Sequence, residues 1–204
     1  MTLIMRDSVR AADIPLAGTD IVCGYSDGTY ADARALASRF PGIPRLLIDV
    51  NGYNVKADVR DWETGDKAGN LAGWVREHNA VAGQRNAIIY CNRSTIPEVR
   101  ALTGAYVLGV DYWLWIATLD GTIFGPSQYP HIVACQNKGS NQTHANYDES
   151  IVWPTAPFQW SGYRQVSSPD REVRASVTWN GDAGPTTRQG IIPWSAWTQI
   201  QWIE

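Results

Sequence analysis

The chain has 204 residues, a formal net charge of −3, 44% hydrophobic residues and 18% charged residues. This length suits one domain, or one domain with a small appendage, and the composition excludes an intrinsically disordered chain. The weak negative charge and the lack of a basic run argue against nucleic acid or an anionic membrane surface as a partner. No apolar run is long enough for a membrane span, and the start of the chain lacks the apolar core of a signal peptide.

Short apolar runs alternate with helical patterns over the first three quarters of the chain. In chain order, the sequence predicts strands over Thr2–Asp7 and Asp20–Tyr25, a helix over Ala31–Phe40, strands over Arg45–Val50 and Ala57–Glu63, a helix over Leu71–Ala82, a strand over Ala87–Cys91, a helix over Ile96–Leu102, and strands over Asp111–Ala117, Ile132–Gln136 and Ser150–Trp153. Continuous apolar runs are typical of strands buried on both faces, and strand–helix alternation favours a parallel α/β architecture.

Eight strands of this kind predict an α/β fold, an irregular (β/α)8-like barrel of the TIM type. The regular version does not fit, because only Asn51–Lys56 joins the third and fourth strands and no helix fits between the seventh and eighth. A parallel crossover needs about a dozen residues. We therefore expect a barrel with fewer helices than strands, in which some neighbouring strands are antiparallel or some helices are missing.

A domain boundary is predicted at the proline-punctuated segment that follows Trp153. It divides residues 1–153, the barrel, from residues 154–204, a small C-terminal β extension. Val173–Gly181 alternates like a half-exposed strand, and Asn180-Gly181 is typical of a hairpin turn. Six of the ten Trp residues lie at or after Trp153. We expect this extension to pack on the barrel or on a partner.

The sequence gives no indication of a disulfide framework, a metal site or a cofactor. Cys23, Cys91 and Cys135 each lie inside an apolar strand pattern, which predicts buried thiols. The chain has no CxxC motif, and its three histidines, His78, His131 and His144, are scattered. A structural zinc site is therefore not expected.

The strongest chemical pattern is Asp61-Trp62-Glu63 at the end of the fourth strand. Residues i and i+2 of a strand point to the same face, so both carboxylates would enter the mouth of the barrel. Two close carboxylates repel, and one of them then holds a proton near neutral pH. An acid beside a base is what glycoside hydrolysis needs. The alternative is a solvated strand end without a chemical role.

Other polar residues fall at strand ends of the same predicted barrel. Asp7 ends the first strand, Gln136 ends the seventh, and Asp148 lies where the eighth begins. Convergence of polar groups on one mouth favours a binding site. Five aromatic residues are candidates to wall a sugar cleft there, with the barrel core as the alternative: Tyr25, Tyr90, Tyr112, Trp113 and Trp115.

The order of these pieces resembles the family-25 glycoside hydrolases, the Chalaropsis-type N-acetylmuramidase lysozymes, and their short relatives in actinobacteria and phages. The matching motifs, over about residues 1–153, are IMRDS with Asp7 and Ser8, DWETGD followed by a helix, IIYCNRS with Tyr90, YWLWIA, IVACQ and YDESIV with Asp148. The resemblance implies that Glu63 is the general acid and that Asp61 positions or polarises the reacting sugar. It also implies that Asp7 and Asp148 complete an acidic floor, with no metal or organic cofactor.

This resemblance leads to three hypotheses about the function of the protein. The first is a phage-encoded, peptidoglycan-degrading glycosidase, an endolysin or a virion-associated lysin, whose partner is bacterial cell-wall glycan. The second is a virion or tail structural protein, or a cell-wall-binding protein, that uses a lysozyme-like barrel as a scaffold. Its extension would bind other virion proteins or a second copy. The third is a host intracellular hydrolase of a different glycan. Without a signal peptide, we expect the protein in the phage virion, or in the host cytoplasm before lysis.

Overall fold

The fold is described from a computed structural model, which covers residues 2–63, 67–82, 87–153, 173–181 and 184–192. The chain divides into two compact units, Met1–Val166 and Ser167–Glu204. The predicted boundary after Trp153 is followed directly by residues outside the described ranges.

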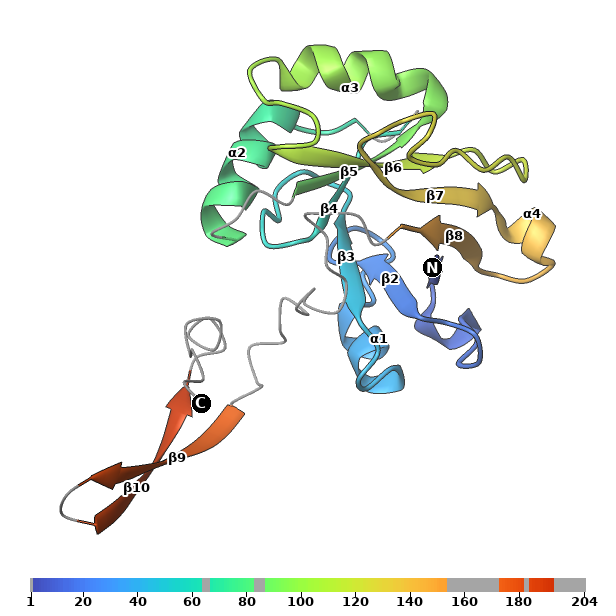
Figure 1. Cartoon of the computed structure of the whole chain (residues 1–204). Helices are drawn as coiled ribbons and strands as arrows, with labels where there is room; N and C mark the ends of the chain where they lie inside the picture. The colour runs from blue at the N-terminus through green and yellow to red at the C-terminus, as the bar shows by residue number, and fades with distance from the viewer. Residues whose placement is uncertain (1, 64–66, 83–86, 154–172, 182–183, 193–204) are drawn as a thin grey trace. The chain divides into compact units, whose positions relative to one another are not determined.

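The first unit is a closed barrel of eight strands, each hydrogen-bonded to the next in chain order (Figure 1). The strands are β1 (Leu3–Asp7), β2 (Ile21–Tyr25), β3 (Arg45–Asp49), β4 (Val59–Asp61), β5 (Ala87–Asn92), β6 (Tyr112–Ala117), β7 (Ile132–Lys138) and β8 (Asp148–Val152). The first seven are parallel, and β8 runs antiparallel to both β7 and β1. The expected irregular α/β barrel is confirmed.

The described residues contain fewer helices than strands, as expected. The helices are η1 (Ala11–Asp13), α1 (Ala33–Arg39), α2 (Leu71–Ala82), η2 (Arg93–Thr95), α3 (Ile96–Thr103) and α4 (Ser140–Thr143), where η marks a 3₁₀ helix. The predicted helix over Leu71–Ala82 is confirmed as α2, and its buried residues Leu71, Trp74, Val75 and His78 recur at helical spacing along one face. The sequence did not predict α4 or the 3₁₀ turns, which are too short to show a helical period.

A loop connects β3 and β4 in place of a helix, and two side chains, Asp49 and Arg60, hold it by hydrogen bonds. The carboxylate of Asp49 accepts the backbone amides of Gly52 and Asn54, at 2.7 and 2.9 Å, and the indole N–H of Trp74 in α2, at 2.7 Å. Arg60 donates to the carbonyls of Asp49 and Val50, both at 2.7 Å, and to that of Ala68. These bonds satisfy backbone groups that a helix would otherwise pair.

Because β8 is reversed, its first residues lie beside the last residues of β1. Asp148, its first residue, pairs with Asp7, and Val152 pairs with Leu3. The strand therefore begins at the end where β1 to β7 finish. Its bounds correct the predicted strand over Ser150–Trp153, which started two residues too late.

Two apolar layers enclose the barrel wall. Trp113, Trp115 and Ala117 of β6 belong to the interior cluster. Tyr112 and the other alternate residues of β6 belong to an outer cluster formed with α2 and α3, which Figure 1 shows packed side by side over this part of the sheet. A third cluster holds α1 and η1 against β2. Both faces of the strands are buried, as their continuous apolar sequences predict.

The three cysteine thiols are expected to be inert in the folded protein. Cys23, Cys91 and Cys135 are all fully buried. Burial raises the pKa of each thiol, that of Cys91 to about 12, so little of the reactive thiolate exists at neutral pH. A thiol reagent should label them only after denaturation, as followed by mass spectrometry. Rapid labelling of two or more in the native state would contradict this packing.

The second unit contains a two-stranded antiparallel sheet of β9 (Val173–Gly181) and β10 (Gly184–Ile192). The predicted strand over Val173–Gly181 is confirmed. The predicted hairpin is confirmed by the antiparallel pairing, but its turn does not lie at Asn180-Gly181, because these are still strand residues and pair with Pro185 and Gly184. We expect the tryptophan-rich extension to bind a partner, but most of its tryptophans lie outside the described ranges: Trp160, Trp194, Trp197 and Trp202.

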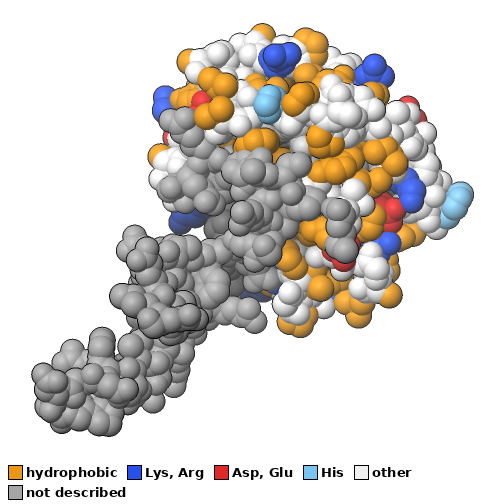
Figure 2. All heavy atoms as spheres, in the orientation of Figure 1, with side chains coloured by type: hydrophobic (Ala, Val, Ile, Leu, Met, Phe, Trp, Pro, Cys, Tyr) orange, Lys and Arg blue, Asp and Glu red, His pale blue; other side chains and the backbone are white. Residues whose placement is uncertain are grey.

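Within the described ranges, no helix is long and apolar enough to cross a bilayer. On the face drawn in Figure 2, Lys and Arg side chains lie at separate positions and form no continuous basic patch.

Candidate active site

Four carboxyl groups gather at the end of the barrel where β1 to β7 finish and β8 begins. Asp7 is the last residue of β1, and its register partner on β8 is Asp148. Asp61 is the last residue of β4, and Glu63 follows two positions later. Asp7 and Asp61 are buried, with 4% and 5% of their surface exposed, and Glu63 and Asp148 are half-buried. The structure thus brings together all four predicted acidic residues.

The electrostatics of Asp7 indicate that these groups share one site. Burial raises the pKa of Asp7 well above its ordinary value, and the negative charges of Asp148, Asp61 and Glu63 raise it further. Its Oδ1 atom is buried and has no hydrogen-bond partner among the described residues. Asp7 therefore keeps its proton to a higher pH than an ordinary aspartate does.

Gln136 lies beside Asp148, but it does not end its strand as predicted, because β7 continues for two more residues to Lys138. Its side-chain amide donates to Oδ2 of Asp148 at 2.7 Å, and Gln136 itself is 2% exposed. Burial raises the pKa of Asp148, while a backbone hydrogen bond and the Gln136 amide act in the opposite direction. The carboxylate thus has a fixed orientation at the site.

Tyr25 and Tyr90 line the carboxyl cluster. Burial raises the pKa of both phenols, and the charges of Asp7 and Asp61 raise them further. Tyr90 is also the register partner of Asp61. Both phenols therefore stay protonated and can donate hydrogen bonds at neutral pH.

The three aromatic residues predicted on β6 are buried and expose almost no surface to a ligand. Trp115 is the register partner of Tyr90 and packs edge-on against it, with 4.8 Å between ring centroids, and is only 1% exposed. Trp113 is deeper in the interior, with its ring 6.1 Å from that of His131. Tyr112 faces outward, and its hydroxyl accepts a hydrogen bond from Thr103 of α3 at 2.9 Å. Alternation along a strand forbids Tyr112 and Trp113 from sharing a face.

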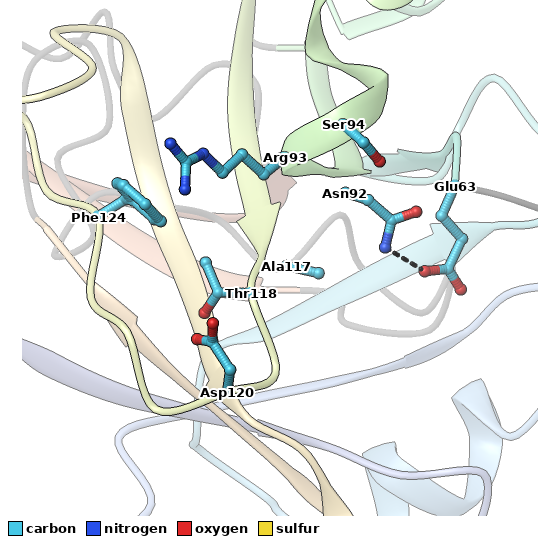
Figure 3. A pocket seen from close by; sticks show the side chains of 8 residues that line it. All are labelled: Glu63, Asn92, Arg93, Ser94, Ala117, Thr118, Asp120 and Phe124. Carbon is cyan, nitrogen blue, oxygen red and sulfur yellow. Dashed lines mark hydrogen bonds between the residues drawn. The ribbon is translucent and has the colours of Figure 1, made fainter.

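Glu63 borders the larger of two depressions, with a volume of about 690 Å³ (Figure 3). Its other lining residues are Asn92, Arg93, Ser94, Ala117, Thr118, Asp120 and Phe124. The amide of Asn92 donates to Oε2 of Glu63 at 3.4 Å. Sequence reasoning missed Asn92, although its place at the end of β5 is the same clue that identified Asp7 and Asp61.

A smaller depression of about 250 Å³ also borders the cluster. Asp7, Tyr25 and Asp148 line it, together with residues of the loops after β1 and before β8. The carboxyl groups thus border two hollows, one lined by Glu63 and one by Asp7 and Asp148. This arrangement suits an elongated ligand that contacts both hollows.

Replacement of Asp7 is expected to stabilise the protein at neutral pH. Because the folded-state pKa is raised, the folded protein binds this proton more tightly than the unfolded chain does. Stability is therefore lost as pH rises from the unfolded pKa, about 4, towards the folded one. Asp7→Asn should raise the Tm at pH 7 by a few degrees, given that 1 kcal/mol corresponds to ~2–4 °C in a domain of this size.

At pH 3 the same substitution should leave the Tm nearly unchanged, because Asp7 is then protonated in both states. Glu77→Gln, at an exposed position of α2, is the matched control and should show no such pH dependence. An Asp7→Asn protein that melts below the parent at pH 7 would contradict the burial of an uncompensated carboxyl group.

The chain offers no evident metal centre in its described part. No group of three or more His, Cys, Asp or Glu side chains there has an arrangement that could hold a metal ion. The chemistry available to the site from these residues is proton transfer and electrostatic stabilisation.

No protein-family model matches the sequence, and no curated protein does either. Among solved structures, the chain is similar to a family GH25 lysozyme from Aspergillus fumigatus, with 12% identity and a TM-score of 0.48 over 76% of this chain and 96% of that one. It is also similar to the modular autolysin LytC from Streptococcus pneumoniae, with 15% identity and a TM-score of 0.49 over 74% of this chain and 47% of that one. A structure of LytC in complex with a synthetic peptidoglycan ligand gives 16% identity and a TM-score of 0.46 over the same shares.

Proposed function

We propose that this protein is a glycoside hydrolase that cleaves the glycan chains of bacterial cell wall. The observation that carries the proposal is the group of four carboxyl residues at one end of the barrel, between two depressions. Glycoside hydrolysis uses a pair of carboxyl groups held in different protonation states. The motif order of the sequence supports the same reaction class.

Glu63 is the proposed general acid. It borders the larger depression and is half-buried, so a glycosidic oxygen can approach it. The amide of Asn92 donates to Oε2 and so orients the carboxyl group of Glu63. Glu63 gives this proton to the leaving oxygen as the bond between that oxygen and the anomeric carbon breaks.

Asp61 is the proposed stabilising carboxylate. As the bond breaks, positive charge develops at the anomeric carbon, and Asp61 stabilises it directly or through the N-acetyl group that attacks this carbon. Water then adds to the anomeric carbon and returns a proton to Glu63. Asp7, Asp148 and Tyr90 surround this pair and set its electrostatic field.

The test is release of new reducing ends from purified actinobacterial cell wall, with mass spectrometry of the soluble products. Cleavage after a muramic acid or a glucosamine unit identifies the bond. Wall incubated with excess protein that yields no new reducing ends would reject hydrolysis as the function.

The tryptophan content of residues 154–204 favours a second function in the same protein. We propose that the protein is phage-encoded and acts from the virion or after synthesis in the host, and that this extension attaches it to cell wall or to other virion proteins. A chain that ends at Val166, the limit of the first unit, should melt like the full chain but lose wall attachment in a pull-down assay. Equal attachment of both chains would count against this role.

A further inference from the structure

Arg93 occupies the part of the larger depression that the proposed chemistry does not use. It follows β5 directly and is exposed. Its Cζ atom lies 4.6 Å from the centroid of the Phe124 ring. Figure 3 shows the guanidinium directed toward Phe124, on the side of the depression away from Glu63. Contact with the face of the ring stabilises the guanidinium without using its N–H donors.

Arg93 forms no ion pair in the described part of the chain, although its positive charge helps to lower the pKa of nearby Asp120. No ion pair or hydrogen bond of its guanidinium is found among those residues. Asp120 borders the same depression, but its Oδ1 atom accepts the amide of Thr122 at 2.8 Å. The fork of donors on Arg93 therefore remains available to a ligand in the depression.

A planar fork of N–H donors matches a carboxylate in a bidentate arrangement. Two classes of glycan with the same type of linkage differ in whether they carry such a carboxylate. Chitin-type chains of N-acetylglucosamine are neutral, whereas cell-wall chains carry a lactyl carboxyl group, free or extended by peptide, on every second sugar. The volume of about 690 Å³ lies in the range of small-molecule sites.

We propose that Arg93 binds a carboxylate carried by the glycan chain, and that this contact makes the site prefer muramic acid-containing chains over neutral ones. The proposal rests on the proposed function and names its substrate class. Phe124 holds the guanidinium, and Asp120 limits the number of anionic groups that the depression accepts. Arg93 is thus a specificity-determining residue, not a catalytic one.

The test measures binding and does not depend on turnover. The probes are a tetrasaccharide of alternating N-acetylglucosamine and N-acetylmuramic acid, the same compound with its carboxyl groups converted to methyl amides, and chitotetraose. In the full-length Glu63→Gln chain, NMR titration should give a Kd for the free acid about tenfold lower than for the amide or chitotetraose. In the Glu63→Gln, Arg93→Gln chain this preference should vanish.

Two control substitutions separate this contact from general charge effects. Arg100→Gln, at an exposed position of α3 outside the depression, should leave the preference intact. Asp120→Asn should tighten binding of the free acid, because it removes a like charge. No binding of the free acid, or a preference that survives Arg93→Gln, would overturn the proposal. A preserved preference in a protein that releases no reducing ends would reject hydrolysis alone.

Discussion

Glu63→Gln is expected to lower the rate of reducing-end release from cell wall by roughly 100-fold or more, which is what a positioned general acid contributes. Gln keeps the shape of the side chain and the hydrogen bond from Asn92, but it has no proton to give. The comparison should use kcat/KM on soluble wall fragments, since the loss is expected in kcat with little change in KM.

Glu77→Gln is the control, because Glu77 is exposed on α2 and lines neither depression. Its kcat should stay close to that of the parent. The acidic residue assignments would fail if Glu63→Gln digested wall as fast as the parent, or if Glu77→Gln lost as much activity as Glu63→Gln.

Trp115→Ala is expected to lower the free energy of unfolding by about 3–5 kcal/mol, the usual cost of deleting a large buried aromatic side chain. Trp115 is 1% exposed, packs edge-on against Tyr90, and donates its indole N–H to Ser150 Oγ at 3.0 Å. The deletion leaves a cavity in the barrel interior. Urea unfolding followed by circular dichroism measures the change.

A double-mutant cycle separates the hydrogen bond of Trp115 from its packing. Ser150→Ala alone leaves a buried indole N–H without its acceptor, and Trp115→Phe alone leaves the buried Ser150 hydroxyl without that donor, each costing about 1–3 kcal/mol. The double variant should be less destabilised than the sum of the two. Strict additivity would mean that the bond contributes nothing. Activity should also fall in Trp115→Ala, since Tyr90 loses the ring that supports it at the site.

The strand ends of this sequence carried enough information to predict the acidic cluster. Apolar runs locate strands, and the ends of parallel strands meet at one end of a barrel, so Asp7, Asp61 and Glu63 could be placed together. Asp148 was assigned to the same mouth although its strand runs in reverse. The start of a reversed strand lies at the same end as the finish of its neighbours.

Other parts of the site could not be predicted from the pattern of apolar and polar residues along the chain. The strand YWLWIA is apolar at every position, so its sequence does not say that Tyr112 faces outward and Trp115 inward. Phe124 meets Arg93 only because the long loop between β6 and β7 packs against β7, where the amide of Phe124 contacts the sulfur of Cys135. Such contacts depend on tertiary packing, and no periodicity in the chain encodes them.

The reversed direction of β8 also decides where the barrel is joined to other chain segments. In an all-parallel barrel of eight strands, the first strand begins at the opposite end from where the last one finishes. Here Leu3 and Val152 are register partners. The chain therefore enters the barrel at β1 and leaves it after β8 at neighbouring points, at the end opposite the carboxyl cluster. Adjacent ends of this kind favour circular permutation and insertion of the whole domain into a host protein. A barrel grafted in this way would keep its mouth unobstructed by the junction.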